Sequence, residues 1–431
     1  MGLSGNRSRV GADAFLGTFA ASALLQGFTV VQGIILARIL GPTGRGEFAT
    51  VILWPNVFSA IGIFGTNIAL ARAAARVEDH DSLTRTSIFL AFITAAIASV
   101  ACYLALPYFL PGGEQHLLGL SRFFVVFILL NHLILNINAV DQGAAHFKRF
   151  NLTRLLLNPV YCIFLVILWI IGLEDIKWVA ASLLLATLVT VVVRLSMTLK
   201  NVKLWGKLHS PIHAFHESAR FGLAGMATSL YFQIDKALIL WMLDPLNLGF
   251  YTVALSASTA IGSVTTSAGM VSFTIAAQEN KGAGFDKIAR AFRISAILWL
   301  LGGTLLALSM GILLPLVYGS DFAPAVNSAR LLIIGSALAG LANLLEQSIR
   351  GQGKAFVGLE GRVYGLIVMA VAGFFMIRGF GLTGGCLAYA FCQSTFLSVI
   401  IRRTNQHYSI NTFSGYIPRW SDVGRLLRLL H

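Results

Sequence analysis

TSIFLAFITAAIASVACYLALPYFL, residues 86–110, decides the class of fold. The stretch contains no charged side chain, and it is longer than the roughly 20 apolar residues that cross the hydrocarbon core of a bilayer as one helix. It is apolar on every face, whereas a strand of a membrane β-barrel would be a shorter segment of alternating polarity. The stretch therefore predicts a transmembrane α-helix.

Comparable stretches recur along the whole chain of 431 residues. Hydrophobic residues make up 56% of the sequence and charged residues 12%, and the mean hydropathy is +0.77. Average globular chains carry about 25% charged residues, so a water-soluble fold of this size could not cover its surface. The sequence predicts an all-α, polytopic membrane protein.

Twelve membrane-spanning segments are predicted. They lie at residues 13–40, 46–71, 86–110, 117–140, 152–173, 178–199, 218–243, 248–277, 291–317, 324–348, 356–377 and 381–401. The first apolar run, from Ala14 to Leu40, exceeds the h-region of about 7–15 residues in a cleaved signal peptide. We therefore expect this run to be a spanning helix that also acts as the targeting signal.

Basic residues fall mainly on alternate breaks between the segments. Of the 32 Lys and Arg residues, 25 belong to one set: Arg7, Arg9, Arg72, Arg76, Arg85, Lys148, Arg149, Arg154, Arg194, Lys200, Lys203, Lys207, Arg220, Lys281, Lys287, Arg290, Arg293, Arg350, Lys354, Arg362, Arg402, Arg403, Arg419, Arg425 and Arg428. The opposite set holds Arg38, Arg45, Arg122, Lys177 and Arg378. Because cytoplasmic loops are enriched in Lys and Arg, the first set and both termini are predicted to face the cytoplasm. The net charge of +14 is spread over these patches, which argues against nucleic acid as a partner.

Two pairs of short motifs indicate an internal repeat. LGPTGRGEF at 40–48 resembles LDPLNLGFY at 243–251, and DQGAA at 141–145 resembles GQGKA at 351–355. The pairs occur in the same order and at nearly the same separation, which indicates two six-helix lobes that run in the same direction around a central cavity. We expect the lobes at residues 1–205 and 206–431, the second with a short cytoplasmic tail.

Motifs of soluble enzymes are absent from the sequence. GQGKA at 351–355 lacks the leading glycine and the final hydroxyl residue of a phosphate-binding loop, and there is no G-x-S-x-G motif. The chain is therefore predicted not to be an enzyme, and neither a cofactor nor a metal site is expected. The cysteines form no CxxC motif and are interpreted as packing residues: Cys102, Cys162, Cys386 and Cys392.

Polar residues inside the predicted spans are the candidate site, because an ionised group at mid-bilayer costs about 2.5–3.5 kcal/mol. Asp235 and Lys236 lie near the middle of segment 218–243, where Thr228, Tyr231 and Asp235 share one helical face. The two charges form either a point on a substrate or ion path or a buried pair that fixes packing. The other candidates are Gln26, Asn56, Asn67 and Glu346. Hydrogen bonds between helices would also explain the three neutral residues, and an i, i+4 pair with Arg350 would also explain Glu346.

IILARILGPTGRGEFA at 34–49 resembles the first-helix signature of the polysaccharide biosynthesis (O-antigen) flippases. The second copy, from Asp235 to Tyr251, looks like the seventh-helix pattern of that family, which belongs to the multidrug/oligosaccharidyl-lipid/polysaccharide (MOP) exporter superfamily. The resemblance implies alternating-access movement of a lipid-linked (polyprenyl-diphosphate) oligosaccharide from the cytoplasmic to the outer leaflet. It implies a substrate path along Gln26, Asn56, Asn67, Asp235 and Lys236, with the forked donors of Arg72 and Arg220 meeting the diphosphate at the cytoplasmic mouth.

The resemblance also implies the setting. The expected partners are a lipid-linked oligosaccharide, membrane lipids, and a polysaccharide polymerase with chain-length proteins, in assembly of lipopolysaccharide O-antigen or exopolysaccharide. The expected location is a bacterial or archaeal inner (cell) membrane. The alternative is a cation-coupled exporter of drugs or metabolites with the same fold, in which Asp235 would bind a proton or sodium. A membrane-embedded glycosyltransferase would need a sizeable outward loop, and the outward loops are short.

Overall fold

The computed structural model describes residues 4–200, 202, 205–259, 262, 281–351, 357–410, 413–419 and 422. Throughout these ranges the regular elements are helices, as the sequence predicted. Contacts divide the chain into two units, Met1–Ser229 (unit 1) and Leu230–His431 (unit 2). The boundary expected at 205–206 lies inside unit 1 of this division.

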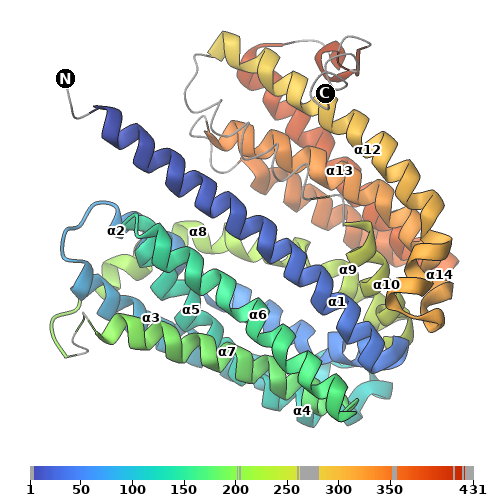
Figure 1. The fold of residues 1–431 in the computed structure, drawn as a ribbon, viewed down its shortest axis with the longest axis horizontal. Coiled ribbons are helices and arrows are strands. Elements are labelled where there is room, and N and C mark those ends of the chain that lie inside the picture. Colours follow the sequence, from blue (N-terminus) through green and yellow to red (C-terminus); the bar gives the residue numbers. More distant parts are fainter. Residues whose placement is uncertain are drawn as a thin grey trace. The chain divides into compact units, whose positions relative to one another are not determined.

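Unit 1 is built from helices, two of which begin at an aspartate that caps them. Its elements are α1 (Ser4–Gly62), α2 (Thr66–Ala74), α3 (His80–Phe109), η1 (Gly112–Leu117), α4 (Leu118–Phe124), α5 (Val126–Gly143), α6 (Phe147–Ile171), α7 (Ile176–Leu199) and most of α8 (Pro211–Tyr231). The side chain of Asp79 caps α3, and that of Asp175 caps α7. In this unit α3 packs against α5, and α6 packs against α1 and α7 (Figure 1).

Unit 2 is centred on α13. Its elements are α9 (Ile234–Met242), α10 (Pro245–Ser258), α12 (Lys281–Tyr318), η2 (Ser320–Ala325), α13 (Val326–Gly351), α14 (Val357–Tyr408) and η3 (Phe413–Tyr416). Helix α13 contacts α10, α12 and α14. Predicted segment 248–277 continues beyond α10, and most of that continuation lies outside the described residues.

Seven of the described helices are long and apolar enough to cross a membrane, and the bent pair α4–α5 adds an eighth span. The polytopic membrane fold is thus confirmed, whereas the count of twelve is not. Part of the difference arises because α1 contains two helices that meet at a kink at Gly41, over segment 13–40 and most of 46–71. In the same way α14 contains two helices that meet at Gly381, over segments 356–377 and 381–401.

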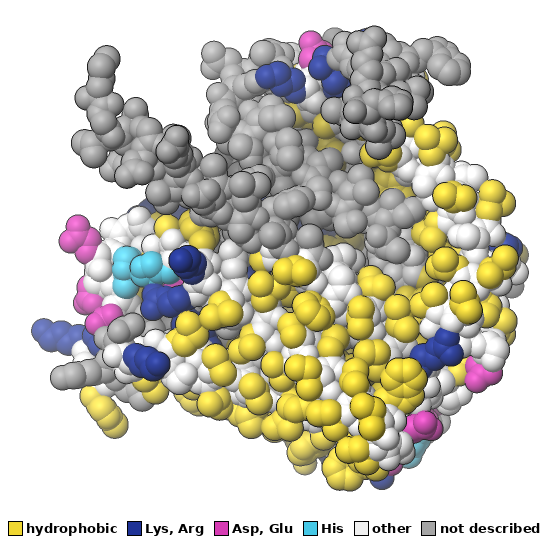
Figure 2. Space-filling view, in the orientation of Figure 1, with side chains coloured by type: hydrophobic (Ala, Val, Ile, Leu, Met, Phe, Trp, Pro, Cys, Tyr) yellow, Lys and Arg dark blue, Asp and Glu magenta, His cyan; other side chains and the backbone are white. Residues whose placement is uncertain are grey.

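The surface of unit 1 is typical of a protein embedded in lipid. Hydrophobic side chains cover the middle of the face seen in Figure 2, and charged side chains gather towards its two ends. On α6 and α7 the exposed apolar residues include Ile163, Ile170, Trp178, Leu185 and Val192. Contiguous apolar surface of this kind is rare on soluble monomers, so lipid is the expected solvent for this band.

In both α1 and α14, one helix ends and the next begins at a single glycine. Gly41 has φ 63° and ψ −176°, and Gly381 has φ 57° and ψ −136°. Pro42 follows Gly41 and, at the matching place of the repeat motif, Pro245 follows Asp244, which caps α10 through the Asn247 amide at 2.7 Å. Proline suits the first position of a helix because its missing N–H is not needed there. The motif that the sequence repeats is therefore a helix-restart signal in both units.

We predict that Gly41→Ala destabilises the protein by about 1–3 kcal/mol, since a side chain is strained in this region of backbone space. A Cβ at this position would meet nothing within 4 Å, so backbone strain alone sets the effect. Thermal unfolding of the purified protein measures it. Gly27→Ala is the matched control, because its Cβ also meets open space while its backbone is helical. Equal melting temperatures for the two variants would contradict the prediction.

The C-terminal segment is fastened to α12 by an ion pair. Arg293 donates from Nε to Asp422 Oδ2 at 2.6 Å and from Nη1 to the carbonyl of Gly415 at 2.7 Å. Tyr416 is buried and packs edge-on against Phe285 and Phe292. Hydrogen bonds from Arg293 hold the pKa of the Asp422 carboxyl below its ordinary value of 3.8.

This depressed pKa predicts the pH dependence of the segment. A carboxyl with a lower pKa in the docked state stabilises docking at neutral pH, and the stabilisation is lost as the pH falls through the docked-state pKa, below 3.8. Asp422→Asn should release the segment already at neutral pH. Hydrogen exchange of residues 413–419 measures the release, and Asp286→Asn, on an exposed residue of α12, is the control. Unchanged exchange in Asp422→Asn would refute the role of the pair.

Candidate functional site

The seventh predicted segment is broken in the structure. The sequence predicted one helix over 218–243 with Thr228, Tyr231 and Asp235 on one face, and this is wrong, because α8 ends at Tyr231 and α9 begins at Ile234. The residues on either side of the break are held by different helices. Tyr231 donates to Gln393 Oε1 of α14 at 2.6 Å, and Asp235 accepts from Tyr251 of α10. A broken span is tolerated where the freed polar groups find partners.

Asp235 and Lys236 form a charged centre at this break. Asp235 is 4% exposed, and its Oδ2 accepts a hydrogen bond from the Tyr251 hydroxyl at 2.8 Å. Its Oδ1 accepts no hydrogen bond from the described residues and lies 3.5 Å from Lys236 Nζ. Asp235 lies in the first turn of α9, where the helix dipole favours a negative charge.

The Lys236 ammonium is the accessible member of the pair. Its side chain is 24% exposed, and Nζ donates to the Phe232 carbonyl at 2.8 Å. An ammonium carries three donors, so Lys236 retains capacity to bind a further acceptor. The pair that the sequence singled out is thus brought together, with the anion buried and the cation partly open.

Glu346 has a stronger partner than the sequence suggested. Arg362 of α14 donates to its two carboxylate oxygens at 2.9 and 2.7 Å, whereas Arg350 lies 4.0 Å away. Because Glu346 is 2% exposed, the forked pair mainly joins α13 to α14. A Cβ on Gly358 would collide with this carboxylate, so a glycine permits the close approach. The sequence had assigned Arg362 to a cytoplasmic patch, and that hid the pair.

The neutral candidates of unit 1 are less closely tied to one another. Asn56 donates to the Ile52 carbonyl of its own helix at 2.7 Å. Gln26 and Asn67 are half-buried. None of the hydrogen bonds described for this unit joins any two of the three side chains.

The two arginines expected at the cytoplasmic mouth belong to α2 and α8. Arg72 is exposed, lies 3.6 Å from the carboxylate of Glu217 and stands over the Phe221 ring at 5.2 Å. Arg220 lies in α8, and its side chain is outside the described residues. Arg72 is therefore an accessible cation that is partly neutralised by Glu217.

A buried polar cluster in unit 1 escaped the sequence analysis. His132 is fully buried in α5 and bonds the Ser59 carbonyl of α1 and the Thr94 hydroxyl of α3, both at 2.9 Å. The Asn131 amide donates to the Ser59 hydroxyl at 2.9 Å. These bonds cross between helices, as polar side chains in membrane helices often do. His132 could not be singled out from the sequence, because a lone histidine within an apolar helix carries no motif that marks it as part of a polar cluster.

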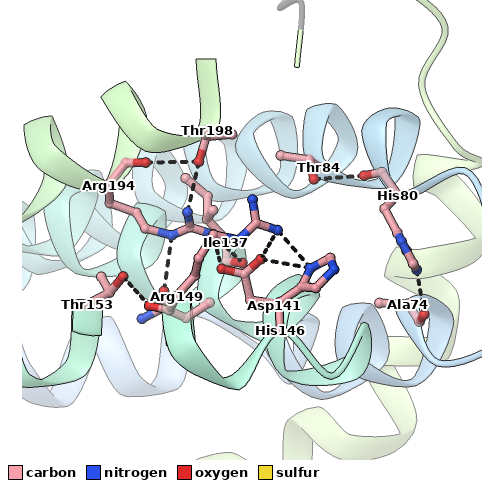
Figure 3. A network of polar contacts seen from close by, with 11 residues as sticks. Ala74, His80, Thr84, Ile137, Asp141, His146, Arg149, Thr153, Arg194 and Thr198 are labelled. Atoms are coloured by element: carbon pink, nitrogen blue, oxygen red, sulfur yellow. Dashed lines mark hydrogen bonds and ion pairs between the residues drawn. The ribbon is translucent and has the colours of Figure 1, made fainter. Parts of the chain in front are cut away.

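The largest network missed by the sequence surrounds Asp141 at the end of α5 (Figure 3). Arg194 of α7 donates to its Oδ2 at 2.5 Å, and Arg149 of α6 lies 2.9 Å from its Oδ1. His146, which precedes α6, lies 3.6 Å from the same carboxylate and 2.7 Å from Arg149. Arg194 is 3% exposed and also bonds Asn138 and Thr198. One carboxylate thus ties the ends of three helices.

A polar pocket of about 560 Å³ opens beside this network. Asp141, Arg149 and Arg194 line it together with acidic residues of the α2–α3 turn, Glu78, Asp79 and Asp81. Asp79 accepts from the Ser82 amide at 3.0 Å, and this backbone bond lowers the pKa of its carboxyl. Acidic and basic side chains thus line the same pocket.

We predict that Asp141→Asn destabilises the protein by about 3–5 kcal/mol, because the buried Arg194 guanidinium would lose its counter-charge. Arg149→Gln should cost at most about 1 kcal/mol, since that side chain is one-third exposed. Thermal unfolding of both purified variants gives the comparison. A smaller loss for Asp141→Asn than for Arg149→Gln would show that Arg194 does not depend on this carboxylate.

Two further groups of side chains could be reactive, the cysteines and one possible metal-binding cluster. The four cysteines are free and buried, which agrees with their interpretation as packing residues. Glu47, Glu114 and His116 place three possible metal ligands within 4.8 Å of one another. Residue 47 is remote from 114 and 116 in sequence, so no spacing motif could have indicated this group.

The fold defines a class, an all-helical, multi-pass membrane protein with the architecture of MOP transporters. An inward-facing multidrug resistance MATE family transporter of the MOP superfamily has a TM-score of 0.73 at 13% identity, with 89% of this chain and 94% of the other covered. The lipid II flippase MurJ in an inward closed conformation has a TM-score of 0.73 at 9% identity, with 96% and 92% covered. A MOP superfamily transporter from Pyrococcus furiosus has a TM-score of 0.61 at 13% identity, with 92% and 94% covered.

The sequence narrows the class to a family. The family model described as polysaccharide biosynthesis protein matches residues 15–277, which is more than half of the chain. The chain therefore belongs to the polysaccharide biosynthesis protein family, as the motif at 34–49 suggested. A search of the curated proteins found no significant match.

Proposed function

We propose that this protein is a flippase that moves a lipid-linked (polyprenyl-diphosphate) oligosaccharide from the cytoplasmic to the outer leaflet, for surface polysaccharide assembly. Membership of the polysaccharide biosynthesis family supports the glycan substrate. The shared fold with a lipid II flippase supports transport of a lipid-linked molecule. Such transport breaks no covalent bond, which fits a chain whose structural neighbours are transporters and a flippase.

The observation that carries the proposal is the charged centre at the broken span. A diphosphate needs a cation, and Lys236 offers a partly exposed ammonium inside an otherwise apolar helix. Asp235 holds that ammonium in place and is itself held by Tyr251, so the cation is positioned without being fully neutralised. Arg72 and Arg220 would receive the diphosphate first, and Gln26, Asn56 and Asn67 would bind sugar hydroxyls.

We further propose that the ends with Arg72, Arg149 and Arg350 face the cytoplasm, together with both termini. This orientation rests on the distribution of Lys and Arg, because 25 of the 32 basic residues fall on one set of alternate breaks between the predicted segments. It places uptake of substrate at the side where lipid-linked sugars are assembled. A bacterial or archaeal cell membrane and association with a polymerase and chain-length proteins belong to the same proposal.

A cation-coupled exporter is the second candidate function. The MATE transporters share the fold. The buried Asp235 Oδ1, which accepts no hydrogen bond from the described residues, would suit a proton or a sodium ion. In this reading Lys236 would compete with the ion for the carboxylate.

Depletion of the protein in its own cells tests both candidates. With a flippase, lipid-linked repeat units should accumulate on the cytoplasmic leaflet while surface glycan falls. Wild type should restore the surface glycan. Asp235→Asn and Lys236→Ala at equal protein level should restore it at least tenfold less well, because each variant removes one charge of the centre proposed to meet the diphosphate. A tenfold loss corresponds to about 1.4 kcal/mol.

Asp244→Asn and Lys177→Ala are the matched controls, because both residues are exposed and lie at helix starts. Both should rescue as wild type does. Unchanged surface glycan on depletion, with new sensitivity to cationic drugs, would overturn the flippase proposal in favour of the exporter. Full rescue by the Lys236 variant alone would remove that ammonium from the substrate path.

A further inference from the structure

An apolar groove runs along the membrane-facing side of unit 1. It has a volume of about 550 Å³ and is lined by α3, α4 and α5. Phe92, Val100 and Leu104 of α3 contribute exposed apolar surface to it, and Ala96 leaves room between them. The polar residues in this lining are Ser99, Tyr103 and Arg122.

Arg122 is unusual because nothing acidic accompanies it in the groove lining. Its guanidinium lies over the Tyr103 ring at 4.5 Å. Its Nε is buried and has no hydrogen-bond partner among the described residues. The planar fork of guanidinium donors suits a phosphate oxygen.

The length of the groove matches one leaflet. From Leu104 to Phe92 the lining spans twelve residues of α3, or about 18 Å at 1.5 Å per residue. Half of a hydrocarbon core is about 15 Å thick. A chain whose head lies near Tyr103 and Arg122 would thus reach the middle of the bilayer at Phe92. A polyprenyl carrier chain is much longer than this distance.

We propose that the groove is a binding site for an anionic phospholipid, whose phosphate is held by Arg122 and whose acyl chain lies between α3 and α5. The leaflet is the one at the Phe109 end of α3, which is the outer leaflet in the proposed orientation. The lipid would fill the apolar surface around Ala96, and its phosphate would bind Arg122, the one charged side chain in the groove lining. The groove lining shares no residue with the charged centre of unit 2.

Native mass spectrometry of the purified full chain, incubated with equal amounts of phosphatidylglycerol and phosphatidylcholine, tests this site. Wild type should retain phosphatidylglycerol in preference to phosphatidylcholine. Arg122→Gln should lower that preference about tenfold, the cost of one hydrogen bond to a charged group. Lys177→Gln, which removes an exposed basic residue of the same unit outside the groove, should leave it unchanged.

A second pair of variants tests the acyl-chain part. Ala96→Phe should fill the groove and lower retention of phosphatidylglycerol, whereas Ile97→Phe, on an exposed neighbour outside the lining, should not. Should Ala96→Phe fail to fold, Arg122→Gln decides alone. Equal retention by wild type and Arg122→Gln would overturn the proposal. So would displacement of phosphatidylglycerol by an equal amount of polyprenyl phosphate, which would make the carrier lipid the occupant.

Discussion

The cost of an unpaired charge in an apolar medium is the constraint on which this structure depends. The buried carboxylates of α5, α9 and α13 are three, and each has a basic neighbour: Asp141 with Arg194, Asp235 with Lys236, and Glu346 with Arg362. Asp141 and Glu346 each make several contacts with arginines of other helices, so these two carboxylates hold the helices of their units together. The Asp235 pair differs, because its cation is adjacent in sequence and partly exposed. That difference is why the charged centre, and not the stronger pairs, is proposed to meet substrate.

The helical membrane fold could be predicted because its determinants are local. Runs such as residues 86–110 contain no charge, and their length alone matches the bilayer. The count of twelve is not confirmed, although the chain kinks at Gly41 and Gly381, at or next to two of the predicted breaks. The break after Tyr231 gave no signal either. No proline or glycine marks it, and the bonds that hold its two sides come from α10 and α14.

The candidate site could be predicted only where charge and position coincided. Asp235 and Lys236 stood out because both interrupt an apolar segment, and the structure places them together. Asp141 and Arg194 lie at predicted segment ends, where charges are ordinary, so their burial required knowledge of how α5 and α7 pack. His132 was hidden in the same way. Ion pairs between helices depend on how the helices pack, and helix packing could not be predicted from this single sequence.

The turn at Gly41 also bears on how the chain resists cleavage. Proteases cut best at exposed loop tips with an extended, accessible backbone. At Gly41 one residue leaves the helical region and Pro42 restarts the helix, so there is no such tip between the first two predicted spans. Gly381 acts in the same way inside α14. A membrane protein whose chain turns at single glycines exposes little backbone to proteases at those turns. The residues that shape its helices would therefore also limit proteolysis in the connections between them.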